Sequence, residues 1–183
     1  MNRRFRCRTA FGLFVLLVLS LVASLSAQRK SDPLNPLEID QLRDAMLDPD
    51  ARLKLYVKFS RDRMTKLEQM RSDPKTTERG AQTRDMLQDF LTIYDELNDN
   101  IDMYVGRKND IRRPMKVVIE ADTEFQSRLR ALKDSANTDP KEAKVYEFVL
   151  TDALDDVDSS AEDHHKTLAE VEEYLKQQKK QKK

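Results

Sequence analysis

The chain has 183 residues, and its 33 basic and 33 acidic side chains give a formal net charge of zero at pH 7. This balance does not predict nucleic acid as a partner, because domains that bind it are usually strongly basic. Cys7 is the only cysteine, so the sequence excludes an intrachain disulfide and a zinc site with several Cys ligands. Charged residues make up 36% of the chain and only three residues are glycine, which favours thin amphipathic helices over a sheet.

Residues 1–27 have the layout of a secretory signal peptide. A basic segment ends at Arg8, an almost wholly apolar segment follows over residues 10–23, and small residues precede a predicted cleavage site near Ala27. The alternative is an uncleaved membrane anchor over residues 10–27, because about 20 apolar residues can span a bilayer. The basic segment stays cytoplasmic in both cases. The sequence therefore predicts export of the remainder to the periplasm or the cell exterior.

The exported part is slightly acidic. Four of the 33 basic residues lie in the signal peptide, so 29 basic and 33 acidic residues remain, for a net charge of −4.

A linker is expected over residues 28–35, and Asn35 with Pro36 begins a short helix that ends near Leu47. Asn is a favoured N-cap, proline suits the first helical position, and Glu38 completes a capping box. The apolar side of this helix consists of Ile39, Leu42 and Met46.

A second helix is predicted from Asp48–Pro49 to about Ser72, and a third over residues 81–105. The third carries the clearest periodicity in the chain, with apolar residues at alternating steps of three and four that form one stripe on a helix. Gly106 is expected to end this helix in a left-handed conformation. The stripe consists of Leu87, Phe90, Tyr94, Leu97, Ile101 and Tyr104.

A fourth helix is predicted after Asn109 and Asp110, which are suitable caps. The last helix is predicted as one element from Pro140 to about Gln178, capped by Asp139 with Glu142. A basic tail is expected over residues 179–183. The inner stripe predicted for the fourth helix consists of Ile111, Met115, Val118, Asp122, Phe125, Leu129 and Leu132.

These elements predict an all-α fold over residues 36–178, in which four long helices and a short N-terminal helix form an antiparallel up-down bundle. Short connections favour antiparallel neighbours, and basic and acidic helices tend to alternate along the chain. Counting residues back from each turn places Ile111 opposite His164, so that residues beyond Lys166 overhang the bundle. The short N-terminal helix is then positioned to cover Leu168, Val171 and Leu175.

Three features could carry chemistry. Glu162 and His165 lie one helical turn apart, as in metal sites on helices, and the turn counting places Asp110 near them as a further ligand. The simpler interpretation is that these polar side chains are solvated and bind no metal, because such a spacing often occurs where there is no metal site. Rows of aspartates could bind hard cations through oxygen, but exposed faces opposite basic helices explain them better. These rows are Asp95, Asp99 and Asp102, and Asp152, Asp155 and Asp156.

Asp122 is the third feature, since it interrupts an apolar stripe. Folding the chain back near Lys108 brings it level with Tyr94, and a hydrogen bond from the tyrosine hydroxyl would satisfy a half-buried carboxylate. We therefore expect a polar pin that sets the helix register, rather than a catalytic carboxylate.

The sequence shows no catalytic constellation and implies no cofactor. It predicts an exported, non-enzymatic bundle that serves as a structural or protein-interaction module of the cell envelope, with a protein partner or a second copy. The alternative is a bundle that binds a metal or small ligand through Glu162 and His165. The five lysines of residues 176–183 could also contact anionic surfaces, whereas no specific nucleic-acid partner is expected.

Overall fold

The computed structural model describes residues 32–136 and 138–181, and residues 33–183 form the compact unit discussed below. The predicted signal peptide, residues 28–31 of the linker and the last two lysines lie outside the described residues. Within these ranges every regular element is an α-helix and no strand occurs, which confirms the all-α class. No helix in this part of the chain has both the length and the apolar character needed to cross a membrane. The helices are α2 (Pro36–Asp44), α3 (Pro49–Ser72), α4 (Arg79–Gly106), α5 (Arg112–Ala136), α6 (Pro140–Ala143) and α7 (Glu147–Gln181).

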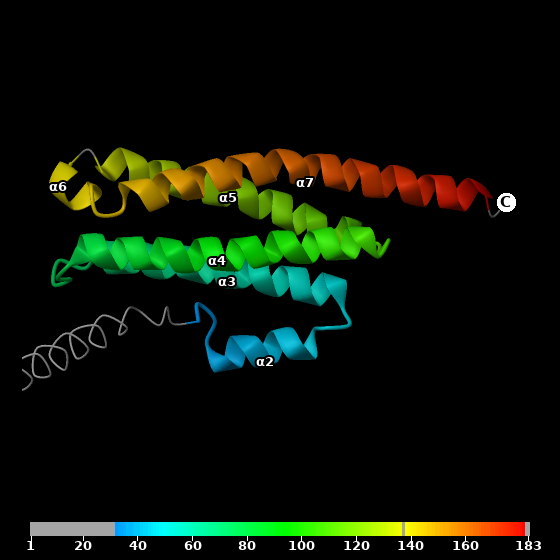
Figure 1. The fold of residues 1–183 in the computed structure, drawn as a ribbon, viewed down its shortest axis with the longest axis horizontal. Coiled ribbons are helices and arrows are strands. Elements are labelled where there is room, and N and C mark those ends of the chain that lie inside the picture. The colour runs from blue at the N-terminus through cyan, green and yellow to red at the C-terminus, as the bar shows by residue number, and fades with distance from the viewer. Residues whose placement is uncertain (1–31, 137, 182–183) are drawn as a thin grey trace, which may run out of the picture. The chain divides into compact units, whose positions relative to one another are not determined.

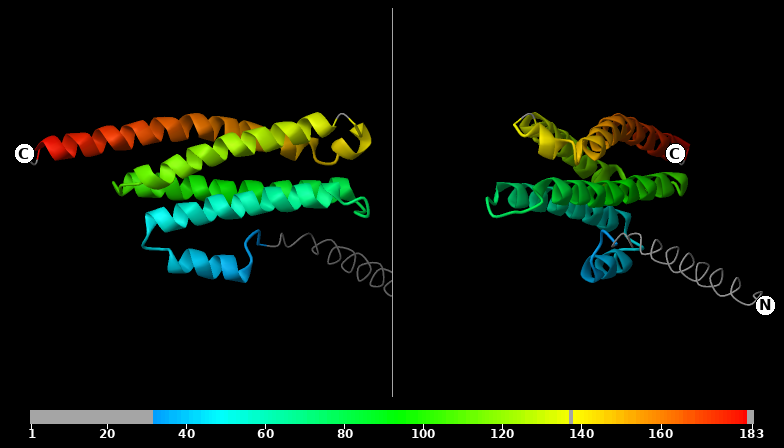
Figure 2. Two further views of the ribbon diagram at one scale, coloured as in Figure 1. Left: turned by 180° about the vertical axis from the view of Figure 1, so that it is seen from behind. Right: turned by 60° about the vertical axis from the view of Figure 1, so that its left-hand side comes forward.

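The four long helices pack in two pairs. α3 packs along α4, and α5 packs along α7, as expected for helices joined by short connections. The two pairs meet where α3 packs on α5 and α4 packs on α7 (Figure 1). α5 begins beside the end of α4 and then diverges from it (Figure 2). Consecutive helices are therefore not always close neighbours, in contrast to the expectation from loop length.

α4 and α5 meet mainly through long side chains. The rings of Phe90 and Phe125 are 5.2 Å apart in an edge-to-face arrangement, and the rings of Tyr94 and Phe125 are 6.1 Å apart. Aromatic side chains of this size fill the space between diagonal helices and contribute stability beyond their buried area. The separation of the two backbones thus follows from the residues that face the centre.

The predicted stripe on α4 forms the centre of the core. Its six members, from Leu87 to Tyr104, have exposed fractions of 0–3%. The stripe predicted for the fourth helix is buried throughout as well. Full burial of one such apolar side chain stabilises the fold by about 1.5–3 kcal/mol, so these two stripes supply much of the driving force for folding.

α2 begins as predicted but packs on a different helix. The side chain of Asn35 accepts hydrogen bonds from the backbone of Leu37 and Glu38, and Glu38 accepts one from the backbone of Asn35, which confirms the capping box. The predicted contact with the C-terminal stripe of the last helix is wrong, because α2 packs on α3, on the side away from α7 (Figure 1). Met46, expected to be an inward residue, is 59% exposed.

The single last helix predicted from residue 140 is also wrong, because the chain turns between α6 and α7. Asp139 caps α6, but Glu142 does not close a capping box. Its carboxylate instead accepts hydrogen bonds from Arg71 at 2.7 Å and Arg79 at 2.9 Å. Tyr146 is buried, with the Arg71 guanidinium 5.3 Å from its ring centre. These contacts hold α6 against the bundle end, and α7 starts only at Glu147.

Gly80 permits this close approach of α6 to α4. A Cβ atom at this position would lie 3.1 Å from the carbonyl oxygen of Glu142 and 3.3 Å from Cβ of Val145. Glu142 lies in α6, and Val145 lies in the turn between α6 and α7. A glycine inside a helix usually costs stability, and here the lack of a side chain allows the turn to dock.

The turn shifts the register of α7. Asp122 lies opposite His164, whereas the sequence counting placed Ile111 there. The contacts of α7 with the other helices therefore extend further toward its C-terminus than expected. Lys108, for example, lies over the ring of Tyr174, 5.6 Å from the ring centre. Its C-terminal end still extends past the turn between α4 and α5 (Figure 1). α7 also includes Lys179 and Lys180, which the sequence assigned to a tail.

The end of α4 differs from the prediction in the residue that adopts the left-handed conformation. Gly106 is helical, and Lys108 is the residue with the left-handed backbone, at φ 59°. The backbone N–H of Asn109 donates to the carbonyl of Tyr104, and that of Lys108 donates to Val105. This pair of bonds is the Schellman motif, in which the left-handed position is usually glycine.

We predict that Lys108→Gly is more stable than Lys108→Ala by about 1 kcal/mol, because alanine at this φ retains the steric strain that glycine lacks. Both variants lose the contact with Tyr174, so their difference isolates the backbone. Urea unfolding followed by circular dichroism measures it. Equal stabilities would show that the turn relaxes instead of holding a strained residue.

Candidate functional site

A buried carboxylate joins three helices of the bundle. Asp122 on α5 is 1% exposed. The Tyr94 hydroxyl on α4 donates a hydrogen bond to Oδ1 of Asp122 at 2.8 Å, and Nδ1 of His164 on α7 lies 2.8 Å from Oδ2. An ionised carboxylate only accepts hydrogen bonds, so His164 donates from Nδ1. The bond predicted between Tyr94 and Asp122 is confirmed.

The network continues from the histidine across the α4–α7 contact. Nε2 of His164 lies 3.1 Å from Oδ1 of Asn98, and the Asn98 side chain donates to Oγ of Ser160 at 3.0 Å. Burial raises the pKa of the Tyr94 hydroxyl, and the charge of Asp122 and the hydrogen bond to it raise that pKa further. The hydroxyl therefore keeps its proton and remains a donor.

Neither Asp122 nor His164 offers an open reactive atom. The exposed fractions of Tyr94, Asp122 and His164 are 0%, 1% and 4%. Both carboxylate oxygens and both ring nitrogens face protein groups, while Phe125 closes the network on one side. A general acid or base must reach a substrate atom directly or through one water. The arrangement therefore serves as the register pin expected from the sequence, with His164 as the member that sequence reasoning missed.

The three predicted metal ligands are not brought together. Glu162 and His165 are exposed on α7. Asp110 is bound by Arg112 at 2.8 Å and 2.6 Å. The positive charge of Lys179 also acts on Asp110, which places Asp110 near the C-terminal end of α7. No group of three His, Cys, Asp or Glu side chains suited to a metal occurs in residues 32–136 and 138–181. Metal binding through Glu162 and His165 remains a prediction from the sequence.

A second buried ionic cluster lies between α2 and α3. Arg63, which is 6% exposed, donates to both carboxylate oxygens of Glu38 at 2.9 and 2.5 Å and to the carbonyl of Pro33 at 2.6 Å. Burial alone would raise the pKa of Glu38, but hydrogen bonds from Arg63 and the Asn35 backbone lower it overall. The signal for this cluster was available in the sequence, because Arg63 interrupts the apolar face of α3 as Asp122 interrupts that of α5.

The aspartate rows occupy the outer faces of two neighbouring helices. Asp99 and Asp102 on α4 and Asp155 and Asp156 on α7 are exposed. α4 and α7 pack against each other, so this side of the bundle is acidic. Partial burial raises the pKa of Asp156, and the charges of Asp152 and Asp155 raise it further. Like charges thus crowd this surface.

The Asp122 network gives a stability prediction. Asp122→Ala removes the carboxylate that accepts from the Tyr94 hydroxyl and pairs with the buried Nδ1 of His164, so we expect a loss of about 3–5 kcal/mol in the free energy of unfolding. Asp99→Ala removes an exposed carboxylate from α4 and should change stability by less than about 0.5 kcal/mol. Urea unfolding compares the two variants. Similar losses in both would contradict the role of the pin.

The Glu38 cluster gives a pH prediction. Because the pKa of Glu38 is lowered on folding, its contribution to stability is present above the unfolded value of about 4.3 and is lost as pH falls through the folded value. Glu38→Gln should lower the melting temperature at pH 7, and its difference from the wild type should shrink between about pH 5 and 3. Asp40→Asn, on the same helix but in an exposed pair with Arg43, is the control and should show little effect at pH 7. A pH-independent difference for Glu38→Gln would rule out the ionised pair.

The chain matches no protein-family model, no curated protein and no solved structure. Its function is therefore inferred from the contacts and charges described above.

Proposed function

We propose that this protein is an exported, non-enzymatic helical bundle that acts as a protein-interaction module of the cell envelope. In this proposal residues 1–27 direct export, and the long helices form an antiparallel bundle with α2 on its outer side. The basic segment and apolar core at the N-terminus support export. The observation that carries the proposal is the saturation of the Asp122 network, since the buried acid–base pair is occupied by the fold itself.

The distribution of charge supports a binding role. Among residues 147–165 of α7 there are seven acidic residues and no lysine or arginine, and residues 81–106 of α4 carry six acidic residues against one basic. These helices are neighbours, whereas the more basic α3 and α5 pack together on the other side. A face of one sign attracts a complementary partner and repels others. We call the surface formed by the exposed carboxylates of Asp99, Asp102, Asp155 and Asp156 the acidic α4–α7 face, and we propose that a basic partner protein binds there.

Crowded carboxylates also reduce stability. Like charges one helical turn apart destabilise a helix by a few tenths of a kcal/mol per pair. Partial burial and, to a smaller extent, the charges of Asp152 and Asp155 raise the pKa of Asp156. Binding surfaces often retain residues that lower stability. The carboxylates of the acidic α4–α7 face are consistent with such a surface.

The test compares two triple variants by crosslinking in the native envelope. One variant, with Asp99→Asn, Asp102→Asn and Asp155→Asn, removes three carboxylates from the acidic α4–α7 face. The control variant, with Asp44→Asn, Glu120→Gln and Asp134→Asn, removes three carboxylates outside this face and changes the net charge by the same amount. We expect the wild type and the control variant to form the same discrete crosslinked product, and the acidic-face variant to lose it, because charge complementarity drives the contact.

The mass of the product distinguishes a second copy of the chain from a different protein. A crosslinked product that is unchanged in the acidic-face variant would reject this face as the binding surface. The absence of any product from envelope fractions would reject the interaction module.

A further inference from the structure

The junction of α4, α5 and α7 is basic, although the chain as a whole has no net charge. Residues 107–116 contain five basic residues and one acidic residue, and residues 172–181 contain three basic and two acidic residues. The two segments meet, because Lys108 lies over the ring of Tyr174. We call this region the basic end and define it by Lys108, Arg112, Arg113, Lys176, Lys179 and Lys180.

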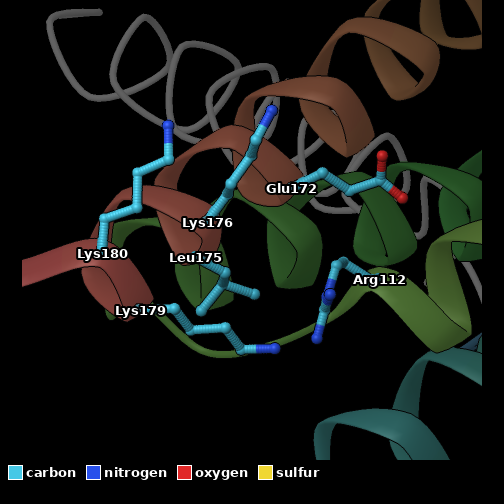
Figure 3. A pocket seen from close by; sticks show the side chains of 6 residues that line it. All are labelled: Arg112, Glu172, Leu175, Lys176, Lys179 and Lys180. Atoms are coloured by element: carbon cyan, nitrogen blue, oxygen red, sulfur yellow. The ribbon is translucent and has the colours of Figure 1, made fainter. Parts of the chain in front are cut away.

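A pocket at the basic end brings two cations together. Its lining includes Arg112, Leu175 and Lys179 (Figure 3). The side chains of Arg112 and Lys179 point toward each other beside Leu175 (Figure 3). Arg112 is paired with Asp110. Among the residues that the structure describes, no carboxylate forms an ion pair with Lys179, although its charge acts on the nearby Asp110. Glu172, also at the rim, points its carboxylate away from Lys179 (Figure 3), and its charge acts on Arg112.

Helix stability alone does not explain this arrangement. Lysines in the last turn of α7 offset the negative end of its dipole, which is a common stabilising pattern. Arg112 and Arg113 begin α5, where the helix dipole is positive and cations are unfavourable. The carboxylate of Asp110 offsets part of this positive charge, because it accepts hydrogen bonds from the backbone N–H of Arg112 at 3.3 Å and from the Arg112 guanidinium. Among the residues that the structure describes, Arg113 and Lys179 form no such pair with a carboxylate, so they leave positive charge for an external anion at this end of α5.

The basic end also presents apolar surface. Leu175 lies within the pocket, and Leu168 and Leu175 are only partly buried against the core. The end of α7 extends past the turn between α4 and α5 (Figure 2), so the other helices leave its last turns accessible. Basic side chains beside apolar ones are typical of segments that lie on anionic bilayers. Single-stranded nucleic acid would instead favour aromatic residues among the lysines, and residues 175–183 contain none.

We propose that the basic end docks on a membrane surface that contains anionic phospholipid, with the phosphate of a headgroup held between Arg112 and Lys179. The surrounding lysines and Arg113 add attraction to neighbouring headgroups, and Leu175 contacts the interface. This surface is separate from the acidic α4–α7 face, so either proposal can fail without the other.

The test measures sedimentation of the full chain with vesicles of phosphatidylcholine alone or mixed with phosphatidylglycerol. Arg112→Gln with Lys179→Gln should weaken partition onto the mixed vesicles roughly 30-fold, since each basic residue near an anionic surface adds about one fivefold step. Lys133→Gln with Lys144→Gln, at the α6 end, is the matched control and should bind as the wild type does. Raising the salt concentration should release the wild type.

Several outcomes would overturn the proposal. These are equal binding to both vesicle types, equal loss in the two double variants, or binding that salt does not weaken. A single-stranded oligonucleotide could release the protein from the vesicles even when its concentration of negative charge is below that of the lipid. That result would identify a polyanion as the partner instead of the membrane. If Arg112→Gln unfolds the chain by freeing Asp110, Lys176→Gln with Lys180→Gln keeps the pocket pair and should still weaken partition.

Discussion

The buried carboxylate of Asp122 constrains the rest of this structure. A carboxylate that is 1% exposed must find donors inside the protein, and Tyr94 and His164 supply them from two other helices. The positions of α4, α5 and α7 along one another are therefore fixed together. A shift of any one of these three helices by one helical turn would leave the buried carboxylate without its partners. Apolar side chains in the same stripes impose no such cost when they repack.

Electrostatics inside and outside the bundle follow different rules. The buried charged side chains of Asp122, Glu38 and Arg63 are paired with good geometry, because an unpaired buried charge is costly. The surface separates charge instead, with acidic outer faces on α4 and α7 and basic residues at the junction of α4, α5 and α7. Water and ions screen such surfaces, so the fold tolerates this separation, and the proposed protein and membrane contacts depend on it.

The sequence predicted the interior of α4 and α5 and the bond between Tyr94 and Asp122, because these depend on helical spacing across one short turn. It failed for the partners of α2 and for the start of α7. The break between α6 and α7, at residues 144–146, depends on Arg71, Arg79 and Gly80, which are more than 60 residues away in the chain. No local propensity signals this break, since residues 140–150 are compatible with a continuous helix. The same error in register placed Asp110 beside His165 and hid the link between Asp122 and His164.

The sequence by itself determined the all-helical class, the apolar stripes and most helix starts, because spacing and capping act within a few residues. Only the tertiary structure decided which helices are neighbours, that α2 lies on α3, and that His164 completes the buried network. It also decided that Arg112 and Lys179 converge. These features arise from long-range packing and from charges that find partners across the fold, and their energies depend on distances that a linear pattern does not contain.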